Sequence, residues 1–253
     1  MPRLSLGNSI ALARREWKGF WSGPAGGLAA AVFLVLAGLW FYNSVASYAS
    51  ANLDAMGRGM ALDSTLALFS GSLERLGLIL LLVTPLSTMR AYADFAGGGH
   101  LDMTLALPLS RAEITLAHFL AGAGSMYLLA LLSLPPFAAL ALLGTGSARL
   151  LLCGALGLLL VTLAFVATGL AVASAASSPS ASALLTLGVL GVFWAAGWAA
   201  PYLPSGAAYL IQGLAFAPRL SHFAAGFIDL NDVLYFLVLT LAGLWLARPF
   251  PDR

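Results

Sequence analysis

Charged residues are scarce in this chain of 253 residues. Lys, Arg, Asp and Glu together make up 9% of the sequence, compared with about 25% in soluble globular domains. Hydrophobic residues make up 60%, and the mean hydropathy is +0.93. A composition this apolar excludes a soluble globular fold and predicts an integral membrane protein.

Residues suited to catalytic or metal sites are also few. Cys153 is the only cysteine and lies in an apolar run, which excludes a disulfide within one chain and a cysteine-based metal site. Neither His100 nor His222 has a second ligand at metal spacing. The "AGGGH" at residues 96–100 lacks the Lys and the Ser or Thr of a phosphate-binding loop. Because the basic residues are scattered, nucleic-acid binding is not expected either, and the chain is predicted to be neither an enzyme nor a cofactor-binding protein.

The uncharged runs predict an all-α polytopic protein with six transmembrane helices in one domain that covers residues 1–253. A transmembrane helix needs about 20 apolar residues. Glu74 and Arg75 interrupt the second span and must lie near its edge, while Pro135 and Pro136 are expected to break or kink the far end of the third. The expected spans are about residues 25–46, 70–89, 114–140, 150–173, 183–202 and 233–248.

Basic residues near the span ends predict that both termini are cytoplasmic, because cytoplasmic loops are enriched in Lys and Arg. With that orientation the inner segments contain eight basic residues and the outer segments four. The inner set is Arg3, Arg14, Arg15, Lys18, Arg90, Arg111, Arg248 and Arg253. The outer set is Arg58, Arg75, Arg149 and Arg219. The N-terminal segment lacks an apolar core followed by a cleavage site, so it is expected to stay attached.

An N-terminal helix at about residues 7–22 is expected to lie in the inner membrane interface. Its expected apolar face consists of Ile10, Ala13, Trp17, Phe20 and Trp21. The basic residues Arg14, Arg15 and Lys18 lie off that face. An apolar face beside basic residues is typical of a helix in the headgroup region, so this segment is predicted to be an elbow helix leading into the first span.

A second amphipathic segment precedes the last span on the outer side, at residues 219–232. Its apolar residues repeat at helical spacing and are Leu220, Phe223, Phe227 and Leu230. Asp229 and Asp232 are both placed to cap the following span, and Asp232 is preferred because the uncharged run begins directly after it. The segment is predicted to be either a passive surface anchor or a gate over the outer mouth of a dimer.

The segment between the second and third spans is the most unusual part of the sequence. It combines three consecutive glycines with the charged residues Arg90, Asp94, Asp102, Arg111 and Glu113. It also contains Leu101, Met103, Leu105 and Leu107, which a solvated connector does not need. The segment is therefore predicted to contain a short cytoplasmic helix that transmits a push to the spans, with a solvated connector as the alternative.

This segment resembles the corresponding part of permeases of the ABC type-2 exporter family, particularly the gliding-motility, GldF-like branch. The resemblance rests on "TMRAYADFAGGGHLDMTLALPLSRAEITLAHFLA" at residues 88–121. The N-terminal "RREWKGFWSGP" is similar to the elbow helix of that family, and "HFAAGFIDLNDVLYF" is similar to the outer segment before its last span. The three matches follow the family's order along the chain.

The resemblance implies a permease subunit of the bacterial inner membrane without its own ATPase site. A separate ATP-binding subunit on the cytoplasmic face would bind ATP and Mg²⁺. The complex would contain two permease chains, identical or related, and an auxiliary periplasmic or membrane subunit is a further candidate partner. The residues implied in ATPase coupling are Arg90, Asp94, Phe95, Gly99, Leu101, Asp102 and Met103. Since Phe95 stands where relatives have a second acid, docking is expected to rest more on apolar contacts.

Two other classes of function stay open. A stand-alone carrier or channel would move its substrate without ATP, and a non-transporting anchor would assemble an envelope complex. The scarcity of ionisable residues at membrane depth argues against a proton-coupled carrier, because a charge at that depth is costly and is kept for a function. No polar set converges at mid-membrane in the sequence, so no substrate is predicted.

Overall fold

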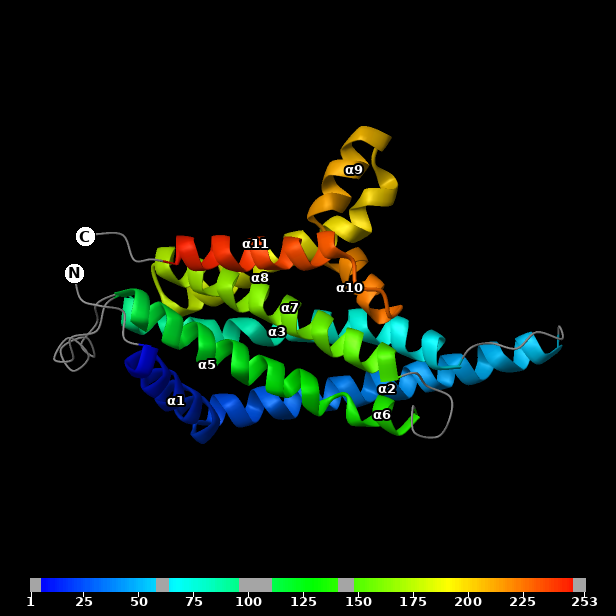
Figure 1. Cartoon of the computed structure of the whole chain (residues 1–253), viewed down its shortest axis with the longest axis horizontal. Helices are drawn as coiled ribbons and strands as arrows, with labels where there is room; N and C mark the ends of the chain where they lie inside the picture. Colours follow the sequence, from blue (N-terminus) through cyan, green and yellow to red (C-terminus); the bar gives the residue numbers. More distant parts are fainter. Residues whose placement is uncertain (1–5, 58–63, 96–110, 141–147, 248–253) are drawn as a thin grey trace.

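The computed structural model describes residues 6–57, 64–95, 111–140 and 148–247. Almost all of these residues are helical, and no strand occurs among them. The helices form an elongated bundle in which helix α1 (Leu6–Ser22) and the end of helix α11 (Leu230–Leu246) lie toward the same end (Figure 1). The all-α class expected from the sequence is therefore confirmed.

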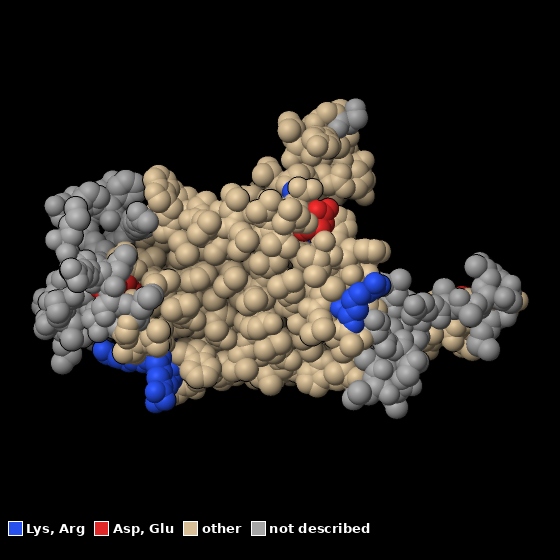
Figure 2. Space-filling model, viewed as in Figure 1, with Lys and Arg blue, Asp and Glu red and all other residues tan. Residues whose placement is uncertain are grey.

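Five helices of the described part are long and apolar enough to cross a membrane. They are α2 (Pro24–Gly57), α3 (Ser64–Phe95), α5 (Arg111–Leu132), α7 (Ala148–Ala175) and α8 (Pro179–Ala199). Helix α11 is also apolar but has only 17 residues, a rise of about 25 Å. Along the body of the bundle the visible surface is almost free of charge, and charged residues gather toward its ends (Figure 2). This apolar band fits a membrane protein.

The expected third span is divided by its two prolines. Helix α5 ends at Leu132, and a separate short helix, α6, runs over Pro135–Leu140. Proline lacks the backbone N–H that continues a helix, but it is well accepted in the first turn of a new one. The Ser133 hydroxyl donates to the Ala130 carbonyl at 2.7 Å and so satisfies one of the acceptors at the break.

Helix α7 lies at the centre of the bundle, between α3, α5, α8 and α11 (Figure 1). Glycines let its neighbours approach closely, as is common between membrane helices. A Cβ atom added at Gly169 would lie 2.7 Å from Cγ2 of Thr88 in α3. One added at Gly243 in α11 would lie 2.7 Å from the backbone carbonyl carbon of Ala167. The largest fully buried side chains are Trp194, Phe33, Phe69, Phe165, Phe216, Phe223 and Phe236.

Helix α1 packs against α5 and α2. Of its predicted apolar face, Ala13 and Phe20 are buried, whereas Ile10 and Trp17 are 59% and 39% exposed. The face turned to the bundle also contains Ser9, which is buried, and the half-buried Glu16. Only part of the apolar face is therefore turned to the bundle, and a membrane helix can be apolar toward lipid and polar toward protein.

The chain between α8 and α11 forms a 3-10 turn (Ala200–Tyr202) and two short helices, α9 (Ser205–Leu214) and α10 (Phe216–Ala224). Helix α9 projects from the side of the bundle (Figure 1), where Tyr209 and Leu210 are exposed. Helix α10 instead packs against α3 and α7. The outer segment is therefore held to the bundle through α10.

Candidate functional site

The junction between α10 and α11 is built around a sharp chain reversal. Helix α10 ends at Ala224 and is followed by Gly226, whose φ of +79° lies in the left-handed region. The Gly226 N–H donates to the Phe223 carbonyl at 3.1 Å, and the Phe227 N–H donates to the His222 carbonyl at 3.0 Å. These two bonds form a Schellman motif, which satisfies the last carbonyls of the helix. The reversal brings the start of α11 back beside α10.

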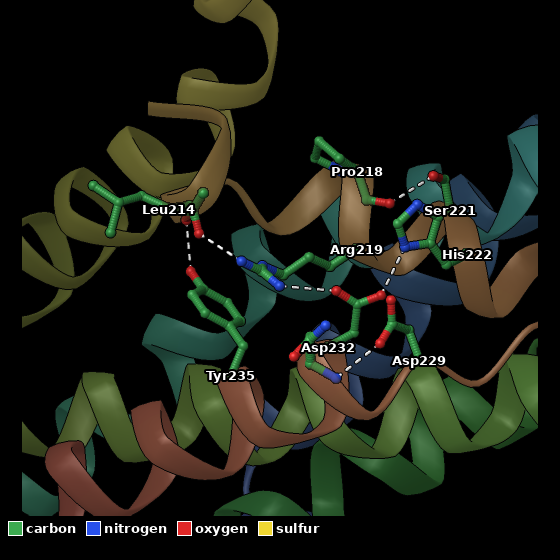
Figure 3. A network of polar contacts seen from close by, with 10 residues as sticks. Leu214, Pro218, Arg219, Ser221, His222, Asp229, Asp232 and Tyr235 are labelled. Atoms are coloured by element: carbon green, nitrogen blue, oxygen red, sulfur yellow. Dashed lines mark hydrogen bonds and ion pairs between the residues drawn. The ribbon is translucent and has the colours of Figure 1, made fainter. Parts of the chain in front are cut away.

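Asp232 is the centre of a polar cluster at this junction (Figure 3). Its side chain is 4% exposed, and its two carboxylate oxygens have different partners. Oδ1 accepts a hydrogen bond from Arg219 Nη1 at 2.8 Å. Oδ2 lies 2.7 Å from Nδ1 of His222. One buried carboxylate in α11 therefore holds two side chains of α10.

Arg219 extends the cluster to α9. Its Nη2 donates to the Gly213 carbonyl at 2.7 Å, and its guanidinium lies 4.0 Å from the centre of the Tyr235 ring. The Tyr235 hydroxyl donates to the Leu214 carbonyl at 2.5 Å. Two carbonyls at the end of α9, which lack helical partners, thus receive donors from α10 and α11 (Figure 3). The cluster ties three helices together.

Asp229, and not Asp232, caps helix α11. The Asp229 carboxylate accepts from the Asn231 N–H at 2.9 Å, and its backbone is extended. The predicted preference for Asp232 was wrong because the helix begins at Leu230, three residues before the uncharged run. Asp232 therefore lies in the first helical turn, where its side chain points toward α10 instead of the backbone.

The four apolar residues of the outer segment do not form one face. Leu220 and Phe223 are fully buried in the bundle, whereas Phe227 and Leu230 are 66% and 69% exposed. The reason is the end of α10 at Ala224, which turns the following residues away from its axis. A single amphipathic helix over residues 219–232 is therefore not what the chain forms.

Sequence reasoning missed Arg219, His222 and Tyr235 as members of one cluster. Arg219 was counted only as an outer basic residue, and His222 only as a residue without metal-ligand spacing. The sequence did contain one signal. Arg219 follows 69 uncharged positions, and Asp232 comes later in the chain, with Gly226 between the two. A cation and an acid that are isolated in this way are candidates for a pair, because a charge near a membrane is rarely left without a partner.

Of the predicted coupling residues, Arg90 lies at the opposite end of the bundle. Arg90, in the last turns of α3, is exposed, and its Nη1 donates to the Gly19 carbonyl of α1 at 3.2 Å. Asp94 and Phe95 belong to the end of α3, but their side chains lie outside the described part. Gly99, Leu101, Asp102 and Met103 lie outside the described residues altogether.

The predicted elbow residues are on the surface of α1. Arg14, Arg15, Trp17 and Lys18 are all exposed. Since Arg90 bonds to Gly19, α1 directly touches the end of α3 from which the predicted coupling segment continues. The structure therefore brings the elbow residues and Arg90 to one end of the bundle, and Phe227, Asp229 and Asp232 to the other.

Within the described ranges, no group of three His, Cys, Asp or Glu side chains is placed to hold a metal ion. Asp232 and Arg219 form an ion pair at 2.8 Å, as expected for a structural tie between helices. No family model matches the sequence, and no protein of established function is detectably similar to it.

Proposed function

We propose that this chain is the transmembrane permease subunit of an ABC type-2 exporter in the bacterial inner membrane. In this proposal α2, α3, α5, α7, α8 and α11 are the six spans, and α1 is the elbow helix. Residues 96–110 supply the coupling helix that contacts a separate ATP-binding subunit. Helix α11 is short for the hydrocarbon core of roughly 30 Å, and local thinning of the bilayer accommodates such a helix.

The observation that best supports the proposal is the contact between α1 and the end of α3. The Arg90 guanidinium donates to the Gly19 carbonyl at 3.2 Å, and α1 packs along α5. A displacement of the coupling segment would therefore act on three helices together, namely α3, α5 and α1.

The proposed mechanism is a two-state movement driven from the cytoplasmic side. ATP binding closes the partner subunits, which push residues 96–110 and shift α3 and α5. At the outer end the Asp232 cluster makes α9, α10 and the start of α11 move as one unit. Because the ATPase binds the two states differently, its ATP cycle shifts their populations.

The experiment that tests this function is ATP hydrolysis by the assembly purified from native membranes. The wild-type chain is expected to co-purify with a vanadate-sensitive Mg-ATPase. Asp102→Lys is expected to lower that activity about fivefold or more, a common size for coupling between two sites.

Asp54→Lys is the matched control, because Asp54 is an exposed acid in α2, outside the proposed coupling segment. This control is expected to keep wild-type ATP hydrolysis. Full activity in Asp102→Lys, or absence of any associated ATPase, would contradict the proposal.

A further inference from the structure

A recess is lined by residues of α1, α3 and α5. These helices come together at one end of the bundle (Figure 1). Its polar lining consists of Glu16, Ser87, Arg90, His118 and Ser125. Phe20, Ala121 and Gly122 complete it with apolar surface. The space is about 310 Å³ and includes the open mouth.

Glu16 is an unusual residue for its position. It lies on the side of α1 that packs against the bundle, between the buried residues Ala13 and Phe20. None of the residues that the structure describes forms a hydrogen bond or an ion pair with it. Because this half-buried carboxylate faces the recess without a described partner, it is available to a ligand with a positive charge.

A second polar group in the recess also lacks a protein partner. Ser125 is 1% exposed, and its hydroxyl has no hydrogen bond in the described structure. Buried hydroxyls are nearly always hydrogen-bonded to protein or to a bound molecule. Ser125 therefore independently indicates that a polar group of a ligand reaches the recess.

Arg90 supplies the opposite charge. Only one of its five N–H groups is used in a bond to a described residue, the bond to the Gly19 carbonyl. The planar guanidinium presents donors in a fork that matches phosphate oxygens. The recess therefore offers an acceptor for a cation and a donor for a phosphate.

We propose that this recess binds the zwitterionic headgroup of phosphatidylethanolamine. The phosphate is held by Arg90, and the primary ammonium reaches Glu16. Phe20 and Ala121 provide an apolar wall for the glycerol and the start of the acyl chains. A lipid is favoured over a soluble ligand because α1 exposes Ile10 and Trp17, which place this helix in the membrane interface.

This arrangement predicts selectivity among phospholipids. The ammonium of phosphatidylethanolamine donates hydrogen bonds to a carboxylate, whereas the trimethylated nitrogen of phosphatidylcholine has no N–H to donate. Phosphatidylglycerol has no cation and is repelled by Glu16. The site does not depend on the proposed transport function, because its components belong to α1, α3 and α5 alone.

The test is native mass spectrometry of the delipidated full chain, titrated with the three lipids with identical acyl chains. The wild type is expected to bind phosphatidylethanolamine about tenfold tighter than phosphatidylcholine, the order expected from one charge-assisted hydrogen bond. Glu16→Gln, which preserves shape, should abolish this preference, because phosphatidylethanolamine loses its charge-assisted hydrogen bond while phosphatidylcholine loses only a weaker charge attraction. Arg90→Gln should weaken the binding of both lipids.

Lys18→Gln is the matched control, because Lys18 is an exposed residue of the same helix outside the recess. It should keep the tenfold preference. Retention of the preference in Glu16→Gln, or equal wild-type binding of both lipids, would overturn the proposal. Equal competition by soluble glycerophosphoethanolamine would overturn the assignment to a lipid.

Discussion

Neutralising Asp232 should selectively loosen the outer junction. Asp232→Asn preserves the shape of the side chain but removes the charge that compensates Arg219, whose side chain is 19% exposed. Removing one partner of a buried pair costs about 3–5 kcal/mol. Here the remaining Gly213 carbonyl and Tyr235 ring still stabilise the guanidinium, and the cost should be nearer ~2 kcal/mol. His222 adds little because its side chain is 54% exposed and solvent screens the pair.

The assay is hydrogen exchange of the α10 and α11 backbone in the purified full chain. A loss of ~2 kcal/mol in local stability corresponds to roughly thirtyfold faster exchange of these amides. Asp229→Asn is the control, because it makes the same chemical change three residues away and Asn caps helices about as well as Asp. Its exchange should stay near that of the wild type.

A double-mutant cycle identifies the pair itself as the cause. Arg219→Met keeps the apolar stem of the side chain but leaves Asp232 with only His222 as a partner. The double variant Asp232→Asn with Arg219→Met buries neither charge, so it should be more stable than the sum of the two single effects by about 1–2 kcal/mol. Additive effects, or equal exchange in Asp232→Asn and Asp229→Asn, would refute the reasoning.

Two further predictions concern packing and topology. Gly243→Ala should lower the free energy of unfolding by about 1–3 kcal/mol in a thermal unfolding measurement in detergent, because the added Cβ meets the α7 backbone. Gly188→Ala, where the added Cβ meets open space, should be neutral or slightly stabilising in the same measurement. In intact cells, an impermeant thiol reagent should label Ser50→Cys but not Ser180→Cys, and the reverse pattern would overturn the orientation deduced from the basic residues.

The positions of the long helices were predictable because their signal is local. An uncharged run of about 20 residues has few alternatives to a membrane helix, and proline acts on the helix that contains it. Runs without charge therefore marked α2, α7 and α8, and Pro135 marked the end of α5. The boundary of α11 was less well marked, because its first turn is polar.

The side-chain environments were less predictable because lipid and protein interior are both apolar. Ile10 and Trp17 belong to the apolar face of α1 but do not pack against the bundle, while the polar Ser9 is buried. Helical spacing identifies a face but does not say whether lipid or protein covers it. Asp232 and Arg219 likewise meet only because a glycine reverses the chain between them.

The most direct test of the proposed function is whether ATP moves the outer end of this chain. A spin label is attached at Phe227→Cys, an exposed position beside the Asp232 cluster, in a chain in which Cys153 is replaced by Ala. In the assembly purified from native membranes, the label reports the distance between two copies of the chain. A permease driven by an ATPase predicts a changed distance distribution when Mg-ATP and vanadate trap the ATPase. An unchanged distribution in an assembly that has trapped the nucleotide would contradict it, as expected for a passive anchor.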